Sequence, residues 1–198
     1  MATYEQLAEL LGRARGALGE GEVAGLRKVS IAAIEVTAID DGEDTLLIAI
    51  ITYMLSKLIS KAHYWEAKRR KRFIQSTLKK IDKCIAAVGK CDIHAYRKVM
   101  RGIMTDIREL ELTDPRYVSD LEAKTRTKLA SRLYAQGFSL SRAVALTGAH
   151  KQDLMAFAGR TLIPDRSGKS KPLKERLKKV RELFAQATLS DSERTWTC

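Results

Sequence analysis

Apolar residues recur every three or four positions along most of this chain, a spacing that is typical of amphipathic helices. Alternation of apolar and polar residues, which would indicate strands, is almost absent, and the sequence holds only three prolines. Glycines and short acidic stretches separate the periodic segments. The pattern therefore predicts an all-α fold.

The first predicted helix begins after Thr3, whose hydroxyl can cap it, and ends at the glycines of residues 19–21. Its apolar face is formed by Leu7, Leu10, Leu11, Ala14 and Leu18. The other helices are expected over residues 22–39, 44–63, 65–88, 92–110, 119–136, 139–146, 150–159 and 172–187. For residues 65–88 the expected buried stripe is Phe73, Ile74, Leu78, Ile81, Ile85 and Val88.

The chain is expected to divide near the turn at residues 113–115, where a proline follows an aspartate. We predict an N-terminal helical bundle over residues 1–112, serving interaction or sensing, and a second domain over 113–189. Residues 190–198 are expected to form a mobile tail. The most apolar stretch, residues 46–55, is shorter than the roughly 20 residues that a membrane-spanning helix needs. It is therefore expected to be a core helix, and no membrane partner is predicted.

The net charge of the chain adds a prediction about its partner, which is expected to be anionic. The formal net charge is +12 and the sequence pI is about 9.7. Residues 61–101 hold 13 Lys and Arg against 3 Asp and Glu, and residues 138–198 hold 12 against 6. Residues 1–60, with 5 against 9, are acidic. The surface that attracts anions is therefore expected beyond the first 60 residues.

Cysteine and histidine spacing gives no sign of a metal site. Cys84, Cys91 and Cys198 show no CxxC spacing, and the three histidines form no HxxxH pair, so we predict no metal and no cofactor. Free thiols in a reducing cytoplasm are the simplest interpretation. The first ten residues lack the basic and apolar regions of a secretory signal, which also favours a cytoplasmic location.

The most informative segment is SLSRAVALTGAHKQDLMAFAGRT, residues 139–161. Ser139 can cap a short helix, Gly148 can take the positive φ of a tight turn, and a second short helix follows. The residues expected to be buried are Leu140, Ala143 and Val144 in the first helix and Leu154 and Phe157 in the second.

Together with the preceding helix, this segment resembles a helix-turn-helix DNA-binding domain over residues 119–161, and it is similar to predicted archaeal transcriptional regulators. The resemblance implies that the second helix lies in the major groove of duplex DNA. The implied base contacts are His150, Lys151, Gln152, Met155 and Ala156. The implied phosphate contacts are Ser139, Ser141, Arg142, Arg160, Lys169 and Lys171. Val144 departs from the pattern, which usually has Ala or Gly four residues before the turn glycine. The alternative is a plain helical hairpin with a solvated polar face.

Near the N-terminus, LAELLGRARGALGEGEVAGLRKVSIAAIE, residues 7–35, resembles the antiparallel helix pair that opens HEPN-type domains. Some HEPN proteins are ribonucleases that carry an Arg, then four to six residues, then a His. None of the three histidines here has an Arg at that distance. The resemblance therefore does not imply nuclease activity.

The densest basic run is Lys68, Arg69, Arg70, Lys71 and Arg72. Five consecutive residues of a helix point all round its axis, so these side chains cannot all be buried. We expect them to be solvated, either as a second nucleic-acid contact, as an RNA-binding face or as a solubilising surface.

Near the C-terminus, apolar residues repeat at alternating spacings of four and three, which is a heptad seam. The seam is formed by Leu173, Leu177, Val180 and Phe184. It predicts either a homodimer or packing onto the protein's own core.

The sequence contains no readable catalytic constellation, so enzyme activity is not expected. We predict a sequence-specific DNA-binding protein, a transcriptional regulator whose partner is double-stranded DNA. The alternatives are an RNA-binding helical protein that uses residues 68–72 and a helical adaptor that binds no nucleic acid.

Overall fold

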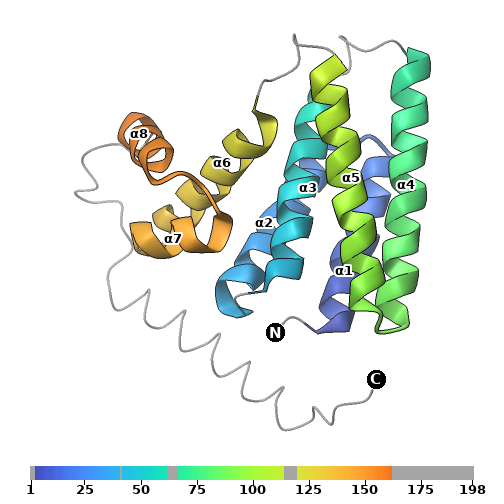
Figure 1. Ribbon diagram of the computed structural model, residues 1–198, viewed down its shortest axis with the longest axis horizontal. Coiled ribbons are helices and arrows are strands. Elements are labelled where there is room, and N and C mark those ends of the chain that lie inside the picture. Colours follow the sequence, from blue (N-terminus) through green and yellow to red (C-terminus); the bar gives the residue numbers. More distant parts are fainter. Residues whose placement is uncertain (1–2, 41, 62–66, 114–119, 162–198) are drawn as a thin grey trace, which may run out of the picture. The chain divides into compact units, whose positions relative to one another are not determined.

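The computed structural model describes residues 3–40, 42–61, 67–113 and 120–161. These ranges hold eight helices and no strand, so the all-α prediction is confirmed (Figure 1). The helices are α1 (Tyr4–Gly19), α2 (Val23–Asp40), α3 (Glu43–Ser60), α4 (Ala67–Gly89), α5 (Ile93–Thr113), α6 (Leu121–Ala135), α7 (Leu140–Thr147) and α8 (Lys151–Thr161).

The central helix is α3, which contacts α1, α2, α5 and α6. Ile48, Ile50, Met54 and Leu55 on this helix have no exposed surface. A helix with neighbours on most sides must be apolar on most sides, which explains why residues 46–55 form the most apolar stretch. Within the described ranges, no helix combines the length and apolarity needed to cross a membrane.

The first helix forms as predicted. The hydroxyl of Thr3 accepts a hydrogen bond from the backbone N–H of Gln6 at 3.2 Å, and the Gln6 side chain accepts one from the Thr3 N–H at 3.0 Å. This reciprocal pair is a capping box. All five residues of the predicted apolar face are buried, and α1 packs against α2 and α4.

The predicted buried stripe of α4 is only partly correct. Ile81 and Val88 are buried as expected. The half-buried members are Phe73, Ile74, Leu78 and Ile85, while Thr77, Cys84 and Ala87 are buried instead. Because α4 packs against α1 and α5 along one narrow side, the larger apolar side chains at the rim of that side keep some contact with solvent.

An ion pair and a hydrogen bond join α5 to the start of α3. Arg97 Nε and Nη2 donate to the two carboxylate oxygens of Asp44 at 2.7 and 2.9 Å, and the Tyr96 hydroxyl donates to the Asp44 carbonyl at 2.8 Å. Burial and then the Asp44 charge raise the pKa of Tyr96 above its ordinary value. The hydroxyl therefore stays protonated and keeps its role as a donor.

The contacts divide the chain after Ala158, into Met1–Ala158 and Gly159–Cys198. In the first unit α6 packs on α3 and α2 and buries Leu129 and Leu133. This compact unit therefore extends past the boundary expected at residues 112/113. The expected helix over 172–187 and the expected tail over 190–198 lie outside the described residues.

The described cysteines differ in burial. Cys84 is free and fully buried, and burial raises the pKa of its thiol to about 12. Cys91 is half-buried in the turn between α4 and α5.

Candidate nucleic-acid interface

The first helix of the candidate interface, α7, is set by Ser139 at its beginning and Thr147 at its end. The Ser139 hydroxyl accepts a hydrogen bond from the backbone N–H of Arg142 at 3.2 Å, which is the predicted cap. Thr147 is buried, and its hydroxyl donates to the carbonyl of Ala143 at 2.7 Å. Ala143 is also buried, on the side of α7 that packs against α6.

Two neighbours of Ala143 differ from the prediction. Leu140 and Val144 are only half-buried, because α7 covers one narrow side against α6. The fully buried position is thus filled by the small Ala143, and the larger Val144 keeps some exposure.

The turn after α7 requires glycine for two reasons. Gly148 has φ 65° and ψ 23°, the left-handed region, and its N–H donates to the Val144 carbonyl at 2.9 Å, which ends α7. A β-carbon at this position would lie 3.0 Å from Nη1 of Arg126. Residues 148–150 then lead directly into α8.

Arg126 on α6 holds the end of α7 in place. Its Nη1 donates to the Thr147 carbonyl at 2.7 Å, and its Nε and Nη2 donate to Glu122 Oε1 at 3.1 and 2.9 Å. Glu122 Oε2 also accepts hydrogen bonds from Arg108 on α5 at 2.7 and 2.9 Å. A cation at the carboxyl end of α7 also complements the dipole of that helix.

The two guanidinium groups control the ionisation of Glu122. Burial by itself would raise the pKa of this carboxyl, but the hydrogen bonds from Arg108 and Arg126, together with their charges, lower it overall. Glu122 therefore remains an anion that links α5, α6 and, through Arg126, α7.

The second helix, α8, has one buried side and one exposed side. Leu154 and Ala158 are buried at 0% and 7% exposure. Phe157 is half-buried, and the Nζ of Lys128 on α6 lies 5.0 Å from the centre of its ring. The side chains left exposed are His150, Lys151, Gln152, Met155 and Ala156, the five residues for which base contacts are expected.

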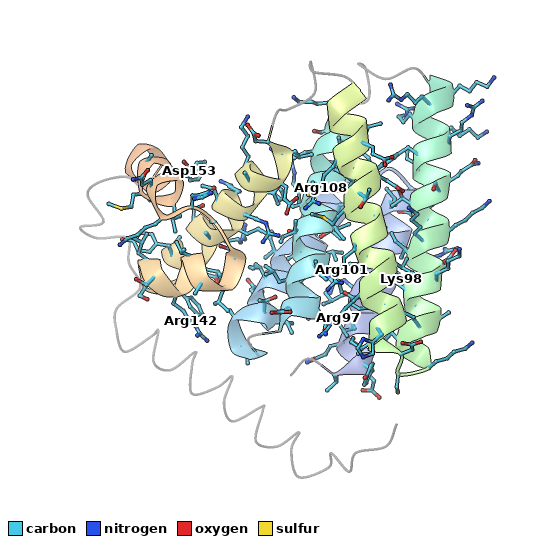
Figure 2. All side chains as sticks on the ribbon, viewed as in Figure 1. Arg97, Lys98, Arg101, Arg108, Arg142 and Asp153 are labelled. Atoms are coloured by element: carbon cyan, nitrogen blue, oxygen red, sulfur yellow. The ribbon has the colours of Figure 1, made fainter. Side chains whose placement is uncertain are left out.

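Asp153 is an additional exposed residue on this side that the sequence analysis did not single out (Figure 2). It lies in the first turn of α8, where a carboxylate complements the helix dipole. It also lies between Gln152 and Leu154, so it adds a hydrogen-bond acceptor beside the expected base contacts. Its position in the first turn was the signal that could have identified it.

The structure brings together only some of the residues that are expected to bind phosphates. Ser139, Ser141 and Arg142 are exposed at the start of α7, but Figure 2 shows Arg142 pointing away from α8. A duplex lying on α8 would therefore reach Arg142 only if it also covered the start of α7. Three further expected phosphate contacts, Arg160, Lys169 and Lys171, lie outside the residues with described side chains. The seam residues Leu173, Leu177, Val180 and Phe184 lie outside them as well.

The basic run lies in the first two turns of α4. Lys68, Arg69, Lys71 and Arg72 are exposed, and Arg70 is half-buried. The first turn of α4 contains no acidic residue. These cations therefore meet the positive end of the helix dipole, which is an electrostatically unfavourable arrangement.

The chain matches no model of a known protein family, no curated protein and no solved structure. Among the residues with a described placement, no group of three or more His, Cys, Asp or Glu side chains is arranged to hold a metal ion.

Proposed function

We propose that this chain is a sequence-specific DNA-binding protein that regulates transcription, with α7 and α8 acting as a helix-turn-helix. The observation that carries the proposal is the exposed part of α8, where Lys151, Gln152 and Met155 are open to solvent while Leu154 is buried. Met155 is 55% exposed, so its side chain is open to contact with a bound duplex.

The geometry of the turn supports this proposal. A DNA-reading helix must project from its support at a fixed angle, because a small rotation would move its side chains off the base edges. Gly148 allows the tight turn, and Arg126 fixes the end of α7 through Thr147 and Glu122. The support of α8 is therefore anchored before any DNA is bound.

The exposed side chains suit the chemistry of the major groove. A lysine can donate to the acceptors of guanine, a glutamine can pair with adenine, and a methyl-bearing side chain can contact the thymine methyl. Asp153 can accept a hydrogen bond from the amino group of cytosine. Ser139, Ser141 and Arg160 would bind phosphates and set the register. Occupancy of an operator would then block or recruit the transcription machinery.

The test begins with a selection from a randomised DNA duplex pool, followed by fluorescence anisotropy with the selected and a scrambled duplex. The wild-type chain is compared with Lys151→Ala/Gln152→Ala across a salt series. We expect the double variant to lose about tenfold or more in affinity for the selected duplex and little for the scrambled one, since each lost base contact costs about 1–3 kcal/mol. Binding should remain steeply salt-dependent because the phosphate contacts are retained.

A matched control is Lys28→Ala, which removes one exposed cation from α2. It should leave the preference for the selected duplex unchanged. Equal losses in Lys28→Ala and the α8 variant, or no sequence enriched by the selection, would overturn the proposal. Absence of binding to any DNA or RNA at low salt would favour the adaptor alternative.

A second candidate function is RNA binding through the run at residues 68–72. The observation that favours it is the cluster of exposed cations at the positive end of α4, because a bound polyanion would relieve that repulsion. The variant Lys68→Gln/Lys71→Gln/Arg72→Gln should then weaken RNA binding strongly while leaving the DNA preference intact. Unchanged RNA affinity in this variant would exclude the run as the contact.

A further inference from the structure

A hollow lies between α2, α3 and α6, on a part of the molecule that α8 does not form. Its volume is about 280 Å³, it is open to solvent, and its uncharged lining residues are Ser30, Ile31, Tyr53 and Leu129. The other lining residues are cationic: Arg27 from α2, Lys57 from α3, and Lys128 and Arg132 from α6. Two consecutive helices, α2 and α3, and the distant α6 thus bring four cations to the lining of one hollow.

Among the residues that the structure describes, no acidic residue lines the hollow. Within the part of the chain that the structure describes, none of the four cations is within ion-pair distance of a carboxylate. Elsewhere the fold does pair its cations: Lys80 binds Asp106 at 2.6 Å, and Arg97 binds Asp44 at 2.7 Å. The hollow is therefore a place where positive charge gathers without a counter-charge from the chain.

Two of the cations are held by aromatic rings rather than by acids. Lys57 Nζ lies 5.4 Å from the centre of the Tyr53 ring, which also lines the hollow. Lys128 Nζ lies 5.0 Å from the centre of the Phe157 ring. A ring does not neutralise an ammonium group, so both groups retain their full charge.

We propose that this hollow binds a small molecule that carries two or more phosphate groups. Two guanidinium groups offer planar forks that fit phosphate oxygens, and two ammonium groups add point charges. Four uncompensated cations suit a ligand with several negative charges better than one with a single charge. The Tyr53 ring and the side chains of Ile31 and Leu129 can contact the uncharged part of the ligand.

The size of the hollow limits the ligand. Small-molecule sites typically measure about 300–1,000 Å³, so this one fits a compact phosphorylated molecule. A nucleic-acid backbone presents the same phosphates, but as a row along an extended chain rather than in a cluster. This proposal stands independently of DNA binding by α8.

The test is isothermal titration calorimetry of the full chain with inorganic pyrophosphate at low ionic strength, with orthophosphate as the single-phosphate comparison. We expect pyrophosphate to bind more tightly than orthophosphate. Lys57→Gln/Arg132→Gln should weaken pyrophosphate binding at least tenfold. The control Lys79→Gln/Arg101→Gln removes one exposed Lys and one exposed Arg from α4 and α5 and should change the affinity less than twofold.

Far-ultraviolet circular dichroism checks that each variant is folded. If Lys57→Gln/Arg132→Gln does not fold, Arg27→Gln/Lys128→Gln removes the other two cations and makes the same prediction. No pyrophosphate binding by the wild type, or an equal loss in the control, would overturn the proposal. Displacement of DNA by pyrophosphate with no heat of binding to the free chain would also overturn it.

Discussion

At the scale of single residues, the backbone conformation at Gly148 restricts which amino acid can occupy that position. Its φ of 65° is unfavourable for any residue with a β-carbon, and such an atom would lie 3.0 Å from Arg126 Nη1. The Arg126 side chain cannot easily move away, because it is hydrogen-bonded to both Thr147 and Glu122. Gly148→Ala should therefore destabilise the protein by about 1 kcal/mol or more, measured by urea unfolding.

The control for this change is Gly16→Ala on α1. Gly16 is exposed inside a helix, and a β-carbon there would meet no atom within 4 Å. Alanine should stabilise the protein there by about 0.5–1 kcal/mol. If Gly148→Ala were as stable as the wild type, the tight left-handed turn that we assign to residue 148 would be wrong.

Thr125 makes a prediction of the opposite sign. Among the described residues, its hydroxyl is buried and has no hydrogen-bond partner. Valine has nearly the same shape and lacks the hydroxyl, so Thr125→Val removes an unsatisfied polar group without opening a cavity. We expect a gain of about 1 kcal/mol in the free energy of unfolding. A loss of stability in urea unfolding would show that the hydroxyl has a partner in solution.

At the scale of elements, Glu122 links α5 and α6 and, through Arg126, fixes α7. Because the two guanidiniums lower its folded-state pKa, the ionised carboxyl contributes stability above its ordinary pKa, near 4.5, and that contribution is lost as the pH falls further. Glu122→Gln should thus be about 1 kcal/mol less stable than the wild type at pH 7. The difference should shrink toward pH 3, as followed by urea unfolding at both pH values.

A suitable comparison is Glu20→Gln, at the exposed end of α1. It removes a carboxylate for which the structure provides no cationic partner among the described ion pairs, so little change at either pH is expected. A Glu122→Gln deficit that stayed constant from pH 7 to pH 3 would contradict the assigned role of the charge.

The elements themselves were largely predictable from sequence, because their signals are local. Thr3 marks the start of α1, Ser139 the start of α7 and Gly148 its end, and each acts within a few residues of its own position. The half-buried rim of α4 could not be predicted in the same way. The width of a buried stripe depends on how closely α1 and α5 approach α4, which the apolar period of α4 alone does not specify.

The two candidate sites also differ in how far each could be predicted from the sequence. The exposed side of α8 follows from one short segment, because Leu154 and the turn fix which side chains face outward. The hollow combines Arg27, Lys57 and Arg132, which are brought together only by the packing of α6 on α2 and α3. A sequence shows the charge of such residues but not their convergence, so only the fold could reveal this site.

At the scale of the whole molecule, Lys128 belongs to both proposals. It lines the hollow, and its ammonium group lies over the Phe157 ring of α8. A polyphosphate in the hollow would attract this ammonium group away from the ring and so weaken one contact between α6 and α8. If both proposals hold, pyrophosphate should raise the dissociation constant for the selected duplex by about fivefold, near the lower end of typical allosteric coupling.

The measurement is anisotropy with the selected duplex at saturating pyrophosphate, against sodium chloride at matched ionic strength, because salt alone weakens DNA binding. Lys57→Gln/Arg132→Gln leaves α8 unchanged, so it should bind DNA normally and lose the response to pyrophosphate. If this variant responded as the wild type does, pyrophosphate would be competing directly at the DNA surface. An unaltered dissociation constant in the wild type, with pyrophosphate bound, would mean that Lys128 carries no signal between the hollow and α8.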